Sequence, residues 1–360
     1  MLRKEIGIAI IGAGRIGTRR ASLAAAHPAV SFIAVSDTEM SRARKLTQDV
    51  GAQFCADTNL QAISRPEVNA VIVATSEHAH LEPVLQALAL GKPVLVEKPV
   101  ALSLEDADRI IAAASRTGMD VRVGYSRRFK RCYLLAKEQV ARGRLGQIVG
   151  MAVRAYNSRA HPLQVLQRSP HATVITDALT YFVDLICWYL AGNRPVEVIA
   201  RGQKGVFKAA GHDLDDVTWA ILTFADGAVV SLGADFALPE KYPTFGPNAR
   251  FEILGTEGVL LIDDDSKDQI LYTERGIPHS YVPGHDLNLA LLNSSSAGDW
   301  VQGDFIGPLA DETRAWLDHL CTGRACMLPT AAEARVTLEI TLAIEEAVRS
   351  KSAVTLPRAG

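Results

Sequence analysis

The chain has 360 residues, of which 48% are hydrophobic and 22% are charged, a composition typical of a globular protein with about two domains. Its 38 lysines and arginines nearly balance 40 aspartates and glutamates, for a formal net charge of −2. We therefore expect no surface for nucleic acid or an anionic membrane. No apolar run reaches the roughly 20 residues that span a bilayer, and the N-terminal segment lacks the long apolar stretch of a secretory signal.

Cysteine usage indicates a protein of the reducing cytoplasm. The five cysteines are scattered, and no two have C-x-x-C spacing: Cys55, Cys132, Cys187, Cys321 and Cys326. We therefore expect reduced thiols, without a structural zinc ion or another bound metal.

Short apolar runs alternate with helical segments over the first third of the chain. The runs predict strands at residues 8–11, 30–36, 70–75, 93–96 and 120–123. The segments between them predict helices at residues 15–26, 41–50, 80–90 and 104–115. Strands and helices that alternate with short links form right-handed crossovers, so we expect a doubly wound parallel sheet.

The pattern changes after about Gly124, where strand-like segments follow one another. Helices are predicted at residues 129–142, 174–190, 308–320 and 331–349, and strands at 147–156, 196–202, 218–224, 228–236, 250–254 and 258–263. Tight turns such as Asp226-Gly227 indicate antiparallel pairs, whereas residues 272–303 are polar and are predicted to be irregular loop. We therefore expect an α/β protein with a parallel-sheet domain at 1–124 and a mostly antiparallel α/β domain at 125–360.

The sequence Gly12-Ala13-Gly14-Arg15-Ile16-Gly17 matches the G-x-G-x-x-G pattern, and it follows a predicted strand and opens a predicted helix. The first glycine permits a tight turn, the second lets the backbone approach a pyrophosphate, and the third lets helix and strand pack closely. The N–H groups at the start of the helix would face the phosphates. The alternative is a glycine turn without a ligand.

Asp37 follows the second predicted strand, 20 residues after Gly17. A carboxylate there can accept hydrogen bonds from the ribose hydroxyls of a dinucleotide and would repel a 2′-phosphate, which favours NAD over NADP. The alternative is that Asp37 caps the next helix, and the nearby Arg42 and Arg44 leave NADP open.

Glu97-Lys98-Pro99 follows a buried strand, at the carboxyl end where ligands bind in an open α/β sheet. The proline favours an extended backbone at Lys98. An ammonium there could polarise a substrate hydroxyl, or a neutral amine could take its proton as hydride leaves. The alternative is a surface lysine–glutamate pair.

Asp177 and Tyr181 lie four residues apart in an otherwise apolar predicted helix, so they share one face. A polar pair on such a helix is a candidate for substrate contact. The alternative is that Asp177 caps the helix and that the tyrosine hydroxyl makes a buried hydrogen bond.

Together these features resemble the Gfo/Idh/MocA family, named after glucose–fructose oxidoreductase, inositol dehydrogenase and a rhizopine-catabolism protein. Glu97-Lys98-Pro99 is the most specific part of the resemblance, which extends over nearly the whole chain. It also includes the segments Ala74-Thr75-Ser76-Glu77-His78-Ala79-His80 and Gly124-Tyr125-Ser126-Arg127-Arg128-Phe129, the Asp177 helix and the two C-terminal helices.

The resemblance implies an NAD-binding Rossmann domain followed by an α/β domain with a large, open, mostly antiparallel sheet. It further implies a homodimer or homotetramer that assembles through the outer face of that sheet, because an exposed apolar face needs covering. NAD is the implied cofactor, and no metal is implied.

Individual residues match the family's motifs at several positions. Lys98 matches the catalytic lysine, Asp177 the acid of the second-domain motif, and Arg127 a position near cofactor and substrate. The other matched positions line the cofactor: Thr75, Ser76, His80, Glu97 and Pro99, together with the glycine turn at Gly12, Gly14, Arg15, Ile16 and Gly17.

The chain departs from the common family pattern at Tyr181, where histidine is usual, and a pair of glycines is replaced by Pro170-His171-Ala172-Thr173. Tyrosine at this position resembles the glucose–fructose oxidoreductase branch. A phenol has an unperturbed pKa near 10, against about 6.5 for imidazole, so Tyr181 would need a nearby cation such as Lys98 to act as a base. Otherwise Lys98 is the base and the phenol donates a hydrogen bond.

The leading hypothesis is NAD-dependent oxidation of a secondary hydroxyl in a sugar, cyclitol or related polyol by Lys98, Asp177 and Tyr181. Alternatives are a non-sugar alcohol such as a dihydrodiol, a sugar acid, or a catalytically silent NAD-binding regulator. Further candidates for substrate contact are Arg127, Arg159, His161, His171, His285 and Trp300.

Overall fold

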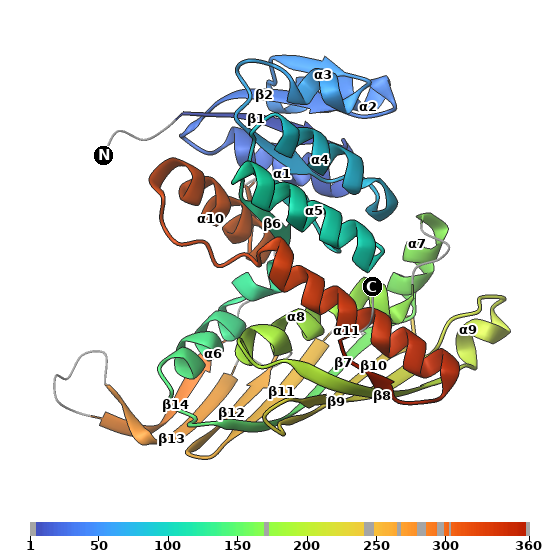
Figure 1. Cartoon of the computed structure of the whole chain (residues 1–360), viewed down its shortest axis with the longest axis vertical. Coiled ribbons are helices and arrows are strands. Elements are labelled where there is room, and N and C mark those ends of the chain that lie inside the picture. Colours follow the sequence, from blue (N-terminus) through green and yellow to red (C-terminus); the bar gives the residue numbers. More distant parts are fainter. Residues whose placement is uncertain are drawn as a thin grey trace. The chain divides into compact units, whose positions relative to one another are not determined.

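The computed structural model describes residues 5–168, 173–240, 248–264, 268–278, 286–293, 299–301 and 304–357. It divides the chain into two compact units (Figure 1). The first combines Met1–Phe129 with Gly298–Leu338, and the second combines Lys130–Ala297 with Glu339–Ala359. The proposed domain boundary between residues 124 and 125 lies close to the first change of unit and stays a prediction.

The first unit contains a six-stranded parallel sheet with the order β3-β2-β1-β4-β5-β6. Its strands are β1 (Ile6–Ile11), β2 (Val30–Ser36), β3 (Phe54–Ala56), β4 (Ala70–Val73), β5 (Val94–Glu97) and β6 (Val121–Gly124). The central strands are apolar along their whole length because both faces of the sheet are covered. This strand order confirms the doubly wound fold and identifies it as a Rossmann fold.

Helices follow the strands of the first unit. They are α1 (Arg15–Ala25), α2 (Met40–Val50), α3 (Asn59–Ile63), α4 (Leu81–Ala89), α5 (Leu104–Thr117) and α10 (Pro308–Thr322), with 3₁₀ turns η1 (Glu77–Ala79) and η2 (Ser126–Phe129). Local signals set their limits: in α5 the Ser103 hydroxyl accepts from the Asp106 N–H at 3.1 Å, and Gly118 ends the helix in the left-handed region.

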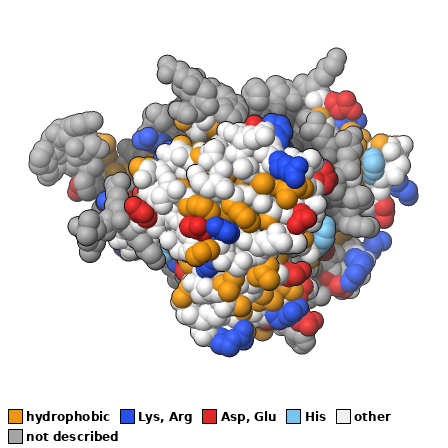
Figure 2. Space-filling model, turned by 90° about the horizontal axis from the view of Figure 1, so that it is seen from above, with side chains coloured by type: hydrophobic (Ala, Val, Ile, Leu, Met, Phe, Trp, Pro, Cys, Tyr) orange, Lys and Arg blue, Asp and Glu red, His pale blue; other side chains and the backbone are white. Residues whose placement is uncertain are grey.

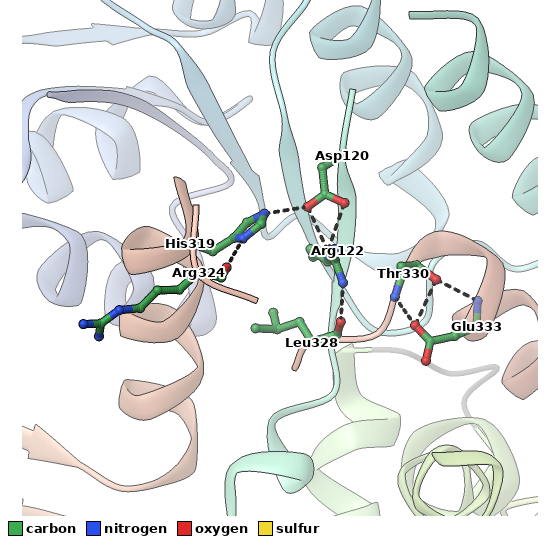
Figure 3. Close-up of polar contacts among 7 residues, drawn as sticks. All are labelled: Asp120, Arg122, His319, Arg324, Leu328, Thr330 and Glu333. Atoms are coloured by element: carbon green, nitrogen blue, oxygen red, sulfur yellow. Dashed lines mark hydrogen bonds and ion pairs between the residues drawn. The ribbon is translucent and has the colours of Figure 1, made fainter. Parts of the chain in front are cut away.

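The edge strand β6 is covered by residues that precede helix α11 (Ala331–Ser350). The Val123 N–H donates to the Pro329 carbonyl at 3.0 Å, and Arg122 donates to the Leu328 carbonyl at 2.9 Å. Arg122 also binds Asp120, and Thr330 and Glu333 cap α11 reciprocally (Figure 3). This segment therefore satisfies backbone groups that an open sheet edge would expose.

The second unit contains a nine-stranded sheet with the order β14-β13-β12-β11-β7-β10-β9-β8-β17. Only the central pair β7–β10 is parallel among the pairs that the structure describes, so the sheet is mostly antiparallel, as expected. The strands are β7 (Ile148–Ser158), β8 (Pro195–Gln203), β9 (Val217–Phe224), β10 (Val229–Leu238), β11 (Asn248–Gly255), β12 (Gly258–Asp263), β13 (Asp268–Pro278), β14 (Asp286–Asn293) and β17 (Val354–Thr355).

Helices cover one face of this sheet (Figure 1). They include α6 (Arg131–Ala141), the π-helical turn η3 (Ile175–Leu179) and α8 (Thr180–Tyr189), while α7 (Ala160–Arg168) and α9 (Val206–Ala209) are short. The packing centres on Phe251, whose ring lies 5.4 Å from that of Tyr133 in α6 and 6.0 Å from that of Phe182 in α8. Inward-facing residues of the strands are accordingly buried and mostly apolar.

The prediction of an irregular loop at residues 272–303 is wrong. The described parts of that stretch form strands β13 and β14, which extend the nine-stranded sheet, and the short strand β15 (Asp299–Val301), which pairs with β16 (Asp304–Ile306). The polar composition of this stretch suggested a loop, but it arises because only one face of β13 is buried. Leu271 and Thr273 face inward, whereas Tyr272 and Glu274 are exposed.

The other face of the nine-stranded sheet carries exposed apolar side chains. Seven of the fourteen large apolar residues that the described chain exposes lie on it: Ile199, Trp219, Ile221, Val229, Leu254, Leu261 and Tyr272. A Cβ on Gly233 would lie 2.4 Å from the Trp219 ring, so this glycine gives the indole room to lie across the neighbouring strand. We call these seven residues the outer sheet face.

Elsewhere the visible surface is mixed. In Figure 2, side chains of both charges are interspersed with apolar ones, in agreement with the small net charge. Within the described residues, no helix is both long enough and apolar enough to cross a bilayer.

Candidate functional site

The glycine turn joins β1 to α1 and needs glycine at two positions for packing. Gly12 has φ +97°, and a Cβ there would lie 2.7 Å from the Ala74 carbonyl oxygen. A Cβ on Gly17 would lie 1.8 Å from the Gly12 carbonyl oxygen, so any side chain would force α1 away from the strand. Around Gly14, in contrast, a Cβ would meet nothing within 4 Å among the described atoms. The open space at Gly14 fits close approach of a pyrophosphate.

Helix α1 begins at Arg15 in a way that suits an anion. Its N-cap is Gly14, no side chain of the described residues caps it, and no acidic residue lies in its first turn. Arg15 itself is exposed and Ile16 is half-buried. The N–H groups and the positive end of the helix dipole therefore favour a phosphate at this position.

Asp37 lies directly after β2 and contacts the glycine turn. Its carboxylate accepts from the Ala13 N–H at 2.8 Å and from the Glu39 N–H at 2.9 Å. Helix α2 begins at Met40 without a side-chain cap, so the alternative in which Asp37 caps this helix does not describe the structure. The half-buried carboxylate lies where the ribose of a dinucleotide is expected.

Strands β1, β4 and β5 are neighbours in the parallel sheet, so their carboxyl ends share one edge. The glycine turn follows β1, half-buried Thr75 and exposed Ser76 follow β4, and half-buried Lys98 follows β5. The order of connections reverses between β1 and β4, where dinucleotides bind in such folds. The first unit thus brings the predicted cofactor residues together at its switch point.

His80 is buried, with 1% of its surface exposed. Its Nδ1 lies 2.9 Å from the Pro99 carbonyl oxygen and its Nε2 lies 3.3 Å from the Thr75 carbonyl oxygen. Burial lowers the pKa of His80 and outweighs both carbonyl contacts, which raise it. The imidazole therefore joins the loop after β4 to the residue after Lys98.

Glu97 forms an ion pair with Arg20. Arg20 Nε lies 2.8 Å from Glu97 Oε1, and the arginine is fully buried. Its Nη2 lies 2.5 Å from Glu312 Oε2, and its Nη1 donates to Thr313 Oγ1 at 2.7 Å. Burial alone would lower the pKa of Arg20, but Glu97 and Glu312 together raise it. Sequence reasoning missed this cluster because Arg20 and Glu312 are 292 residues apart.

The arginine pair after β6 has one buried and one half-buried member. Arg128 is buried, donates to the Met327 carbonyl at 3.4 Å and lies 3.7 Å from Glu333. Arg127, in the same turn η2, is half-buried and is the member predicted to lie near the cofactor.

In the second unit, Asp177 lies in the π-helical turn η3, and Tyr181 lies in the first turn of α8. Both are half-buried, whereas nearly all other residues of this helical stretch are buried. π-turns are rare and often mark functional positions. The structure therefore gives the two predicted side chains a common, partly accessible strip.

Thr173, not Asp177, caps this helical stretch. The Thr173 hydroxyl accepts from the Thr176 N–H at 3.1 Å and donates to Glu345 at 2.6 Å. The capping alternative for Asp177 is therefore wrong, and its carboxylate is not needed for that role.

A small recess lies beside Asp177. Apart from Asp177 and Thr173 its lining is apolar: Pro162, Val165, Leu166, Val174, Leu214 and Phe236. Three of these residues come from α7, a helix that was not predicted from the sequence. This location was not predicted.

The remaining candidates for substrate contact are only partly described. Half-buried Arg159 donates through Nε to the Leu238 carbonyl at 3.2 Å, which holds it to β10. His161 lies in α7 and Trp300 in β15, with side chains outside the described part, and His171 and His285 lie outside the described residues. Within the described chain, no three His, Cys, Asp or Glu side chains are grouped as a metal ion requires.

The strand order, the glycine turn and Asp37 define the first unit as a dinucleotide-binding oxidoreductase domain. Residues 6–125 match the model of the oxidoreductase family with an NAD-binding Rossmann fold, and residues 133–261 match the GFO/IDH/MocA C-terminal domain. The chain belongs to the Gfo/Idh/MocA oxidoreductase family, as the motifs predicted, and its first unit is the NAD-binding part.

Similar proteins include several inositol dehydrogenases. The chain is 31% identical over 316 residues to inositol 2-dehydrogenase of Acidothermus cellulolyticus, covering 85% of this chain and 88% of the relative. It is 27% identical over 268 residues to myo-inositol 2-dehydrogenase of Thermotoga maritima, covering 74% and 78%. Scyllo-inositol dehydrogenase of Lactobacillus casei, solved with NAD(H) and scyllo-inositol, has the same fold, with a TM-score of 0.77 at 20% identity over 98% of this chain and 99% of the other.

Proposed function

We propose that this protein oxidises a secondary hydroxyl of a cyclitol, sugar or related polyol and transfers the hydride to NAD. The observation that carries the proposal is the position of Lys98, which follows β5 at the sheet edge that also holds the glycine turn. The inositol dehydrogenases among the relatives support a cyclitol as substrate.

NAD, when bound, supplies the carbon that accepts the hydride. The residues of the first unit fit this cofactor: the space at Gly14 leaves room for the pyrophosphate, and the start of α1 presents N–H groups. Asp37 would accept hydrogen bonds from the ribose hydroxyls and would repel a 2′-phosphate, which favours NAD over NADP.

Lys98 is assigned to the proton of the substrate hydroxyl. Its ammonium would donate a hydrogen bond to the hydroxyl oxygen, or its neutral amine would accept the proton as hydride leaves. Tyr181 would donate a hydrogen bond or, beside a cation that lowers its pKa, would accept that proton. Asp177 would orient the substrate through its carboxylate.

The test is NADH formation with a panel of inositols, sugars, sugar acids and dihydrodiols. We expect turnover of at least one cyclitol or sugar, and we expect Lys98→Met to abolish turnover while NADH affinity stays within about threefold of the parent. Lys92→Met is the matched control, because Lys92 lies at the other end of β5 and binds the carbonyl groups of Ile63 and Arg65. Full turnover in the Lys98 variant, or no NADH binding by the parent, would contradict the proposal.

A second candidate substrate class is favoured by the recess beside Asp177. Its largely apolar lining would leave a substrate hydroxyl that entered it with few polar partners besides Asp177 and Thr173. An alcohol with an apolar part, such as a dihydrodiol or a cyclitol ether, suits that lining better. A preference of about tenfold or more for a methyl ether over the parent cyclitol would support this candidate.

We also propose that the chain forms a homodimer or homotetramer through the outer sheet face. The proposal is supported by the seven exposed apolar residues that cross adjacent strands, since soluble proteins seldom leave such a patch uncovered. A second copy of the chain offers the same apolar surface and is therefore the simplest occupant.

A further inference from the structure

Arg20 is a fully buried cation with two carboxylate partners. Its guanidinium contacts Glu97, Glu312 and Thr313 through three different nitrogen atoms, at 2.8, 2.5 and 2.7 Å. We call these four residues the Arg20 cluster. It joins three elements of the first unit: helix α1, strand β5 and helix α10.

Stability alone does not explain the cluster. Burying ions costs hydration energy, and well-packed apolar residues in place of a buried ion pair are often equally or more stable. Three charge-assisted hydrogen bonds from one planar guanidinium do, however, fix the orientation of the groups that they join. The cluster is therefore better suited to placing a neighbouring atom than to adding stability.

The neighbouring residue is Lys98. Glu97, immediately before it, is held by Arg20, and Pro99, immediately after it, contacts buried His80 at 2.9 Å. Gly124, paired with Glu97 in register, packs tightly against the cluster, because a Cβ there would lie 3.0 Å from both Glu97 Oε2 and Arg20 Nη2. Buried groups therefore fix the backbone on both sides of Lys98.

We propose that Arg20 and Glu312 are positioning residues for Lys98, and this inference rests on the proposed function of Lys98 in hydride transfer. Arg20 holds Glu97, Glu312 fixes Arg20, and the end of β5 then presents Lys98 in one orientation. A displacement of about 1 Å at a reacting group can cost about 100-fold in rate. A residue of α10, far along the chain from the glycine turn, thereby contributes to catalysis without contacting the substrate.

The principal test is Glu312→Gln, which keeps the side-chain volume and one oxygen acceptor for Arg20. We expect kcat to fall about tenfold or more, while KM for the polyol and the NADH dissociation constant change less than about threefold. Arg20→Lys keeps the charge but cannot reach Glu97, Glu312 and Thr313 together, so we expect a larger loss of kcat.

Arg122→Lys is the matched control. Arg122 also joins the sheet to the C-terminal part of the first unit, through Asp120 and the Leu328 carbonyl (Figure 3). It pairs in register with Leu95, before the end of β5, so its loss should lower the melting temperature and leave kcat unchanged. A merely structural role of Glu312 would give the same result as this control, and that outcome would overturn the proposal.

A second measurement does not depend on turnover. Hydrogen exchange of the peptide that spans residues 94–101 should accelerate about tenfold in Glu312→Gln and stay unchanged in Arg122→Lys. Unchanged exchange in both variants would overturn the positioning role. If the parent turned over no substrate but the exchange result held, the proposed function would fail while the effect of Glu312 on this segment stood.

Discussion

Asp37 contacts the protein through the same carboxylate that is proposed to hold the ribose. Because it already binds the Ala13 and Glu39 N–H groups, its oxygens are oriented before a cofactor arrives. Arg42 and Arg44 follow in α2 and could meet a 2′-phosphate once the carboxylate is removed.

We expect Asp37→Ser to weaken NADH binding about tenfold, since hydrogen bonds to a charged group contribute about 1.5–3 kcal/mol. NADPH binding should improve at the same time. Fluorescence titration with both cofactors measures the ratio, and Asp37→Asn, which keeps an acceptor for Ala13, separates charge from loop geometry. An unchanged ratio in both variants would remove Asp37 from cofactor selection.

His80 links stability to pH. Burial places its folded-state pKa below the unfolded value of about 6.5, so the unfolded chain binds the proton first as pH falls. The stability that the neutral imidazole contributes is therefore complete above about pH 6.5 and is lost as pH falls toward the folded-state pKa.

We expect His80→Gln to be less stable than the parent by about 1 kcal/mol near pH 8, for the loss of a buried hydrogen bond. The difference should shrink as pH falls to about 5. Protonation of His80 then stabilises the unfolded state of the parent, whereas the variant has no imidazole at this position to protonate. Thermal unfolding of both proteins across this range tests the expectation. Melting curves that stay parallel would mean that His80 titrates alike in both states.

At the scale of elements, the first unit could be predicted almost strand by strand. Its parallel strands are continuous apolar runs, and the glycine turn marks the start of α1. The short β3 and α3 were missed because three to five residues carry too little periodicity. Strand β13 was missed because only one of its faces is buried, so it contains many polar residues.

Candidate site residues could be named from the sequence where a motif consists of adjacent residues, as at Gly12 or Lys98, and their roles stay predictions. Contacts were not predictable where distant segments meet, as in the pairing of Arg20 with Glu312. The π-turn at Asp177 could not be predicted from the sequence either, because its hydrogen-bond pattern arises from packing and not from a residue preference.

At the scale of the whole molecule, the outer sheet face is the surface through which we propose that copies of the chain associate. Trp219 lies on β9, across Gly233 of β10, with 47% of its surface exposed. An exposed aromatic residue that becomes buried on association is the typical anchor of an interface.

We therefore expect the parent to have a solution mass of two or four chains and Trp219→Glu to be monomeric or strongly shifted toward monomer. Light scattering after size-exclusion chromatography measures both. Leu60→Glu is the control, because Leu60 is equally exposed but lies in α3 of the first unit. A monomeric parent, or a variant with the parent's mass, would exclude assembly through this face.

The chain returns to the first unit only after strands β7 to β14 of the second unit have been synthesised. The six parallel strands leave the ribosome well before α10, yet Trp316 and Leu317 of α10 belong to the same core as Ile8 and Ile10 of β1. Until α10 emerges, Arg20 lacks Glu312 and the edge of β6 lacks Pro329. The core of the first unit therefore stays incomplete until nearly the whole second sheet has been translated, and during this interval its exposed apolar surface is most prone to aggregation.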